Sequence, residues 1–268
     1  MATKDSLGDR MKEFYENRSR MYLPRRSPVM IRIDGKAFHS FTRHFEKPYD
    51  KIFHTAMNET LMFLCKNIQG CKFGYTQSDE ISLVITDYDT LTTDAWFDYG
   101  IQKMCSVAAS MATMAFNSAF CKAVTEARLA LPTMSADDPL KVYAAKAGTA
   151  MFDARVFNIP KEECCNYFIW RQQDATRNAI QMLGQSHFSH RELEGRSCND
   201  IQDMLFIEKG INFNDMPVEF KRGICCYRTN VPCVDRLIGY KREWVLDKEC
   251  PIFTQDRDYV EKHLDVSE

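Results

Sequence analysis

The chain has 268 residues, of which 45% are hydrophobic and 27% are charged, and its formal net charge is −2. This composition is typical of a folded globular protein and argues against a disordered chain or a strongly basic, non-specific nucleic-acid binder. The segment from Met1 to Arg26 is charged and we find no apolar run of membrane-spanning length, so we expect no membrane partner, no secretory signal and a cytoplasmic location.

The cysteines indicate a reducing environment. There are 11 of them, with two adjacent pairs (Cys164-Cys165 and Cys225-Cys226) and no C-x-x-C spacing. An odd count without that spacing is typical of neither a disulfide framework nor a zinc site. We therefore expect buried, reduced thiols.

The first part of the chain alternates between strand-like and helix-like segments. Asp50 and Asp94 are each placed to cap a helix, and Pro160 closes the last strand. Residues 131–149 are rich in Pro, Ser and Asp and predict a loop. In chain order we predict a helix over 11–21, a strand over 29–33, a helix over 51–68, strands over 71–76 and 81–85, a helix over 95–125 and a strand over 152–159.

This order is strand, helix, strand, strand, helix, strand, which is the split βαβ or ferredoxin-like pattern of an α+β protein. Its sheet is expected to be antiparallel with helices on one face. After residue 160 the pattern predicts a mostly helical region, with helices over 164–183 and 199–209 and a possible strand over 223–228.

Two acidic stretches stand at strand ends. Asp34-Gly35 closes the first strand, and Asp79-Glu80 interrupts two strand-like runs as the turn of a hairpin. Asp-Gly is also a common turn former, and spacing alone slightly favours that plainer interpretation. In the split βαβ topology, however, the first and third strands are neighbours, so Asp34 and Asp79 should meet in space.

Two carboxylates in that position can bind divalent metal ions that contact a substrate phosphate. Mg²⁺ takes oxygen ligands and few of them from protein, so we predict two Mg²⁺ ions held by Asp34, Asp79 and the Gly35 carbonyl. Glu80 is a further catalytic carboxylate or a support, and strand alternation should turn its side chain to the other face.

The chain carries an ordered set of motifs at 32–41, 47–50, 77–80, 152–155, 170–172, 210–214 and 221–223. This ordered set resembles the tRNA-His guanylyltransferase family. The resemblance implies a polymerase palm over 1–160, with residues 161–268 completing the same globule and contacting tRNA and other subunits. It also implies a nucleotidyltransferase that activates the 5′ end of tRNA with ATP or GTP and then adds nucleotides in the 3′-to-5′ direction, and a homotetramer.

The resemblance further implies roles for individual residues. Solvent-exposed charge is the plainer interpretation of Lys47 and Lys103, and a core histidine that of His39. The implied nucleotide-binding residues are Lys36, Ala37, Phe38, His39, Lys47, Asp50, Ser78 and Lys103, and the implied RNA-binding residues are Arg155, Arg171, Asn178, Asn212, Lys221 and Arg222.

The chain departs from the pattern of the tRNA-His enzymes at several positions. Thr176-Arg177-Asn178 stands where eukaryotic members carry His-Ile-Asn, Ile201 replaces a common basic residue, and Gly100 replaces a common arginine. The first departure is typical of the family's like-protein branch and favours template-dependent repair of 5′-truncated tRNA. The alternatives are a dedicated enzyme that adds one G to tRNA-His, a palm-domain nucleotide cyclase, and a non-catalytic RNA-binding module.

Overall fold

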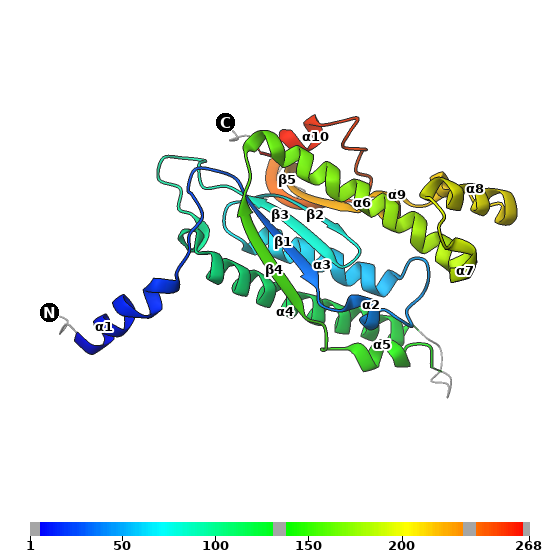
Figure 1. Ribbon diagram of the computed structural model, residues 1–268, viewed down its shortest axis with the longest axis horizontal. Helices are drawn as coiled ribbons and strands as arrows, with labels where there is room; N and C mark the ends of the chain where they lie inside the picture. The colour runs from blue at the N-terminus through cyan, green and yellow to red at the C-terminus, as the bar shows by residue number, and fades with distance from the viewer. Residues whose placement is uncertain (1–5, 131–137, 233–239, 265–268) are drawn as a thin grey trace.

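The computed structural model describes residues 6–130, 138–232 and 240–264. Its centre is a six-stranded antiparallel sheet in the order β4-β1-β3-β2-β5-β6 (Figure 1). The first and third strands are neighbours, as the split βαβ pattern predicted. The strands are β1 (Val29–Gly35), β2 (Cys71–Gln77), β3 (Glu80–Ile85), β4 (Phe152–Asn158), β5 (Ile224–Pro232) and β6 (Tyr240–Asp247).

Helices occupy most of the remaining described chain. The α-helices are α1 (Ser6–Phe14), α2 (Phe38–Phe41), α3 (Lys51–Asn67), α4 (Ile101–Leu129), α5 (Lys141–Lys146), α6 (Lys161–His187), α7 (His190–Leu193), α8 (Cys198–Lys209), α9 (Val218–Arg222) and α10 (Asp258–Glu261). Three 3₁₀ turns join them, namely η1 (Glu16–Ser19), η2 (Trp96–Tyr99) and η3 (Phe213–Asp215).

The sheet is covered by helices on both faces, so the expectation of helices on one face was wrong. Ile31 and Ile81 pack with α3 and α4, whereas Met30 and Val84 pack with α6 and the C-terminal segment. Every residue of β3 is buried. A strand that is covered on both sides reads as a continuous apolar run rather than an alternation, and that run was visible over 81–85.

The palm part confirms the predicted strands and the helix that Asp50 caps. The Asp50 carboxylate accepts a hydrogen bond from the Phe53 amide, the usual N-cap geometry. The predicted start of the next helix was wrong, because three consecutive residues, Phe97 to Tyr99, have positive φ and interrupt helical winding. The helix α4 therefore begins at Ile101 and not after Asp94.

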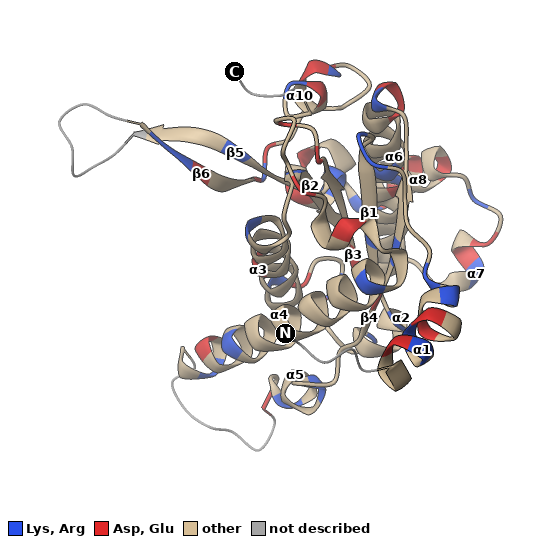
Figure 2. Ribbon diagram, turned by 90° about the vertical axis from the view of Figure 1, so that its left-hand side faces the viewer, with Lys and Arg blue, Asp and Glu red and all other residues tan. Residues whose placement is uncertain are grey.

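The segment after residue 160 contributes strands as well as helices. The possible strand over 223–228 is confirmed as β5, which pairs with β2, and β6 pairs with β5 although no strand was predicted there. The two form a long ribbon that extends beyond the body of the molecule (Figure 2). Of the predicted loop, residues 131–137 lie outside the described chain, and α5 forms in the remainder.

One described helix is long and apolar enough to cross a membrane by length and composition, contrary to our expectation from the sequence. It is α4, and a soluble core helix passes the same test. One side of α4 packs against α3, β1 and β4 through buried residues such as Phe116 and Phe120. Ten cysteines of the described part of the chain are free thiols, and seven of these are buried.

Candidate active site

The end of β1 and the turn of the β2–β3 hairpin lie side by side. Asp34 is opposite Glu80 in the β1–β3 ladder, and the Gly35 amide donates a hydrogen bond to the Asp79 carbonyl oxygen at 3.1 Å. Ser78 has a left-handed φ of 50°, and its Oγ donates to Asp79 Oδ1 at 3.0 Å. The fold therefore brings the two predicted carboxylates, Asp34 and Asp79, to one place.

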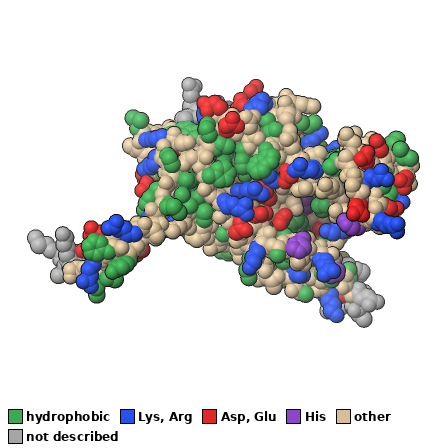
Figure 3. All heavy atoms as spheres, in the orientation of Figure 1, with side chains coloured by type: hydrophobic (Ala, Val, Ile, Leu, Met, Phe, Trp, Pro, Cys, Tyr) green, Lys and Arg blue, Asp and Glu red, His purple; other side chains and the backbone are tan. Residues whose placement is uncertain are grey.

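Both carboxylates line a cavity of about 400 Å³, which we call the acidic pocket. It lies between the loop after β1, the start of α3, and the facing surfaces of α6 and α9. In Figure 3 charged side chains of both signs and histidines gather around a hollow in the surface. The charged side chains that line the acidic pocket are Asp34, Glu46, Lys47, Asp50, Asp79 and Glu219.

The acidic pocket carries a negative charge that few cations offset. Burial raises the pKa of Asp79, and the charge of Asp34 raises it further. The Arg155 guanidinium reaches Asp34 only at 4.0 Å and is itself largely exposed. A polyphosphate could enter such a pocket only together with cations.

The donor set fits Mg²⁺. Two carboxylates and a backbone carbonyl leave positions for water and for phosphate oxygens, as Mg²⁺ prefers. Among the described residues no three His, Cys, Asp or Glu side chains come together as a metal cluster. A closed, all-protein metal cage of that kind is therefore absent from the part of the chain that the structure describes.

The loop after β1 is held in a narrow geometry. A Cβ on Gly35 would lie 2.4 Å from the Phe38 ring, so any larger residue there would have to displace that ring. Ala37 is left-handed with φ 56°, and the Lys36 amide donates to the Met151 carbonyl at 2.9 Å. Phe38 is buried among other aromatic rings, including Phe41, and anchors α2. The Ala37–His39 part of the loop thereby lies along the acidic pocket.

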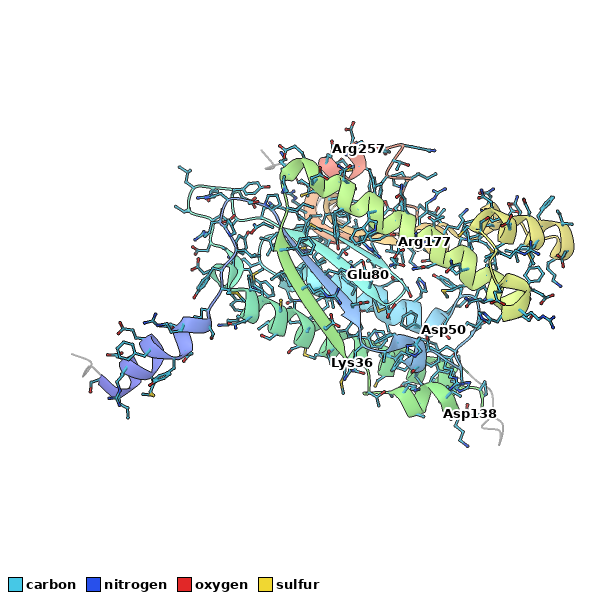
Figure 4. The ribbon with its side chains drawn as sticks, in the orientation of Figure 1. Lys36, Asp50, Glu80, Asp138, Arg177 and Arg257 are labelled. Carbon is cyan, nitrogen blue, oxygen red and sulfur yellow. The ribbon has the colours of Figure 1, made fainter. Side chains whose placement is uncertain are left out.

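The facing wall is built around Asp50, which Figure 4 labels at the start of α3. Its Oδ1 accepts from the Phe53 amide at 2.7 Å, and its Oδ2 accepts from the Glu46 amide at 3.0 Å and from the Tyr143 hydroxyl. These bonds immobilise Asp50 and hold the segment that carries Lys47. Lys47 itself lines the pocket, as a phosphate-binding residue would.

Sequence reasoning missed His54, which also lines this wall. Its ring stacks on Tyr49 with centroids 4.0 Å apart, and its Nδ1 is buried without a hydrogen-bond partner. Burial lowers the pKa of His54 to about 4, against the opposing charges of Glu219 and Asp50. A single histidine on a helix carries no spacing signal. His54 joins the pocket wall through Tyr49, whose ring also contacts Phe220 of α9.

Comparisons with known proteins agree with this geometry. A family model described as tRNAHis guanylyltransferase (Thg1) matches residues 8–160, which is more than half of the chain. The chain belongs to the tRNA(His) guanylyltransferase family. Members of this family are nucleotidyltransferases, and the chain has their palm-like fold.

Solved structures and curated relatives extend the match. A bacterial Thg1-like protein in complex with ATP is 42% identical with a TM-score of 0.82, covering 98% of this chain and 100% of that one. A bacterial Thg1-like protein in complex with GTP is 41% identical with a TM-score of 0.76, covering 97% and 99%. The tRNA(His) guanylyltransferase of Saccharomyces cerevisiae is 28% identical over 73% of this chain and 80% of its own length.

Within this family member, the structure does not support a direct catalytic role for Glu80. Its Oε2 is 2.6 Å from the Arg32 guanidinium and its Oε1 is 2.7 Å from Arg171 Nε, so both oxygens are engaged in ion pairs. The expected turn to the other face was also wrong. Asp79 lies in the turn. Glu80 pairs directly with Asp34, so the side chains of Glu80 and Asp34 lie on the same face of the sheet, the face that α6 covers.

The same network encloses Arg171, for which the resemblance implied RNA binding. Its side chain is 3% exposed and forms ion pairs with both Glu80 and Asp174, and its guanidinium carbon lies 4.3 Å from the centroid of the Trp170 ring. A guanidinium so enclosed cannot reach an RNA backbone. We assign Arg171 and Glu80 to holding α6 against the sheet beside Asp34.

Two predicted nucleotide contacts lie away from the acidic pocket in the chain as folded. Lys103 is in the first turn of α4, and its Nζ lies 4.6 Å from the centroid of the exposed Phe97 ring. It precedes Phe116, which packs beside Phe38, by nearly four helical turns, or about 20 Å. The side chain of Lys36 is exposed and does not line the pocket, although its amide helps to hold the loop.

The remaining predicted RNA contacts are distributed over three places. Asn178 lines the acidic pocket from α6. The Asn212 side chain caps η3 by accepting from the Asn214 amide at 3.0 Å. Lys221 and Arg222 line a second cavity on another face of α6.

Proposed function

We propose that this chain is a Mg²⁺-dependent enzyme that activates the 5′ end of tRNA with ATP or GTP and then adds nucleotides in the 3′-to-5′ direction. The observation that carries the proposal is the pair Asp34 and Asp79 in the lining of a pocket whose charged side chains are mostly carboxylates. The likeness to Thg1-like proteins in complex with ATP and with GTP supports it.

The chain's own residues have definable parts in this reaction. Asp34, Asp79 and the Gly35 carbonyl would hold Mg²⁺, which supplies activation of the attacking hydroxyl and charge neutralisation on the phosphates. The backbone from Ala37 to His39 and the ammonium of Lys47 would position the triphosphate from opposite walls. The Gly35 amide, bonded to the Asp79 carbonyl, keeps the two carboxylates in register.

We further propose templated repair of 5′-truncated tRNA over addition of a single G to tRNA-His. Thr176 stands where the tRNA-His enzymes of the family carry histidine, and its hydroxyl is engaged with the Lys221 carbonyl at 2.9 Å. No imidazole is therefore presented at that position. The higher identity to Thg1-like proteins than to the yeast tRNA(His) enzyme favours the same reading. A homotetramer, which the resemblance implies, and a cytoplasmic location, which the sequence pattern suggests, remain predictions.

The test is nucleotide addition to a tRNA that lacks its first nucleotide, with each NTP supplied separately in Mg²⁺. Restoration of whichever base pairs with the template supports repair, whereas addition of G alone, and only to tRNA-His, supports the dedicated enzyme. Formation of a cyclic nucleotide without RNA would overturn both.

Three variants test the assignment of the carboxylates. Asp34→Asn and Asp79→Asn should abolish addition while the thermal unfolding temperature stays within a few degrees of the wild type. Asp153→Asn is the matched control, because Asp153 pairs with Asp34 across β1 and β4 but is exposed and does not line the pocket. Full activity in either Asp34→Asn or Asp79→Asn would refute the assignment.

A further inference from the structure

A second cavity, of about 360 Å³, lies on another face of α6, and we call it the cationic pocket. Its lining contains Lys221 and Arg222 and no Asp or Glu side chain. Thr176 and Ile180 line it from α6, whereas Ala179 and Met182 of the same helix line the acidic pocket. The two pockets are therefore separated by about one helix diameter, 10–12 Å.

The charge balance of the cationic pocket is the reverse of that of the acidic pocket. Lys221 is only 8% exposed, and its Nζ donates to the Asn214 carbonyl oxygen. Among the residues that the structure describes, neither Lys221 nor Arg222 has an ion-pair partner. Two adjacent cations, one of them buried, are costly unless an anion joins them.

The electrostatics agree with that geometry. Burial lowers the pKa of Lys221, and the neighbouring Arg222 lowers it further. Asp215 and Glu249 act in the opposite direction, but each acts more weakly than Arg222. An anion bound beside Lys221 would offset both the burial of its charge and the repulsion by Arg222.

The rest of the lining indicates what kind of anion fits. The amide side chains of Gln173 and Asn214 line the same cavity and can donate or accept hydrogen bonds. Ile252 and Phe213 add apolar surface next to these polar groups. A phosphate that carries a sugar and a base has this combination, and the volume exceeds what a bare ion needs.

We propose that the cationic pocket binds a phosphate group directly, without a metal ion, as a second anion site across α6 from the acidic pocket. The phosphate belongs either to the RNA strand that reacts in the acidic pocket or to a free nucleotide. This inference does not rest on the proposed reaction, because it concerns binding by residues that do not line the acidic pocket.

The test measures binding in EDTA, which removes the divalent ions that the acidic pocket needs. The full-length chain is titrated into a fluorescent 5′-truncated tRNA over a series of salt concentrations. Arg222→Gln should weaken binding about tenfold and reduce the slope of log affinity against log salt by about one, as loss of one phosphate contact does. Arg191→Gln, an exposed arginine of α7 that lines neither pocket, is the matched control and should change neither quantity.

Lys221→Met is a second variant, with a thermal melt to establish that it folds, and it should weaken binding in the same direction. Competition by ATP in EDTA assigns the site to a free nucleotide, and lack of competition assigns it to the RNA backbone; either result supports a phosphate site. Wild-type protein that binds neither probe in EDTA, or Arg222→Gln that binds both as the wild type does, overturns the proposal.

Asp34→Asn separates this inference from the proposed function. It should lose nucleotide addition and keep its EDTA-resistant binding. If Asp34→Asn retains nucleotide addition, the proposed function fails while the Arg222→Gln result still decides the phosphate site.

Discussion

The buried network of Glu80 and Arg171 predicts a large loss of stability in Arg171→Met. The Arg171 and Glu80 side chains are 3% and 6% exposed, and their Nε and Oε1 atoms are 2.7 Å apart. Removing one partner of a buried ion pair costs about 3–5 kcal/mol, because the other charge stays buried. Arg32 remains bonded to Glu80 at 2.6 Å, so we expect the lower end, about 3 kcal/mol.

For a protein of this size, that loss corresponds to a fall in the unfolding temperature of roughly 6–12 °C. The assay is thermal and urea-induced unfolding followed by circular dichroism, with nucleotide addition measured well below the transition. The matched control is Arg177→Met on the same helix, where the side chain is 57% exposed, and it should change the free energy of unfolding by less than about 0.5 kcal/mol.

A double-mutant cycle with Glu80→Gln sharpens the test. The losses of unfolding free energy in the two single variants, added together, should exceed the loss in the double variant by about 0.5–3 kcal/mol, because each single variant removes the same interaction. The reasoning is refuted if Arg171→Met unfolds like the wild type but loses RNA affinity, which would make Arg171 an RNA contact. It is equally refuted if Glu80→Gln keeps its stability and loses turnover, which would restore the catalytic role.

Three further changes probe the walls of the acidic pocket. Gly35→Ala should cost about 1–3 kcal/mol in unfolding experiments and weaken ATP binding in calorimetry, because its Cβ would lie 2.4 Å from the Phe38 ring; adding Phe38→Leu should restore part of both. Tyr143→Phe should cost about 1 kcal/mol in urea unfolding by removing one hydrogen bond to Asp50, and unchanged stability would refute that bond. The lowered pKa of His54 means that the folded state disfavours its protonated ring. The contribution of neutral His54 to stability is therefore fully present above the unfolded pKa of about 6.5 and is lost as the pH falls toward about 4. In His54→Phe the unfolding temperature should fall less steeply over that pH range, and a slope equal to that of the wild type would contradict the assignment.

The sequence was sufficient wherever a local pattern has one physical meaning. Asp50 is an N-cap in sequence and in space, because a cap depends only on its own next three residues. The strand order followed from element order, since few connections are possible for a split βαβ unit. The sequence by itself therefore predicts that Asp34 and Asp79 lie close together.

What the sequence could not reveal depends on side chains that meet from distant elements. The position of Glu80 next to Asp79 suggests a catalytic carboxylate, and only the packing of α6 shows that Arg32 and Arg171 form ion pairs with both its oxygens. His54 has no local signal, and it joins the pocket wall because its ring stacks on Tyr49, which contacts Phe220 of α9.

The chain alone thus determined the palm topology, the pair of carboxylates and the family, because each depends on short-range patterns in a fixed order. The tertiary structure decided which charges are available. Arg171 is enclosed by Glu80 and Asp174, whereas Lys221 and Arg222 line a pocket with no carboxylate. Whether a charged side chain can bind a ligand depends on its burial and on partners from distant parts of the chain. The sequence alone does not distinguish a buried, paired arginine from an unpaired one.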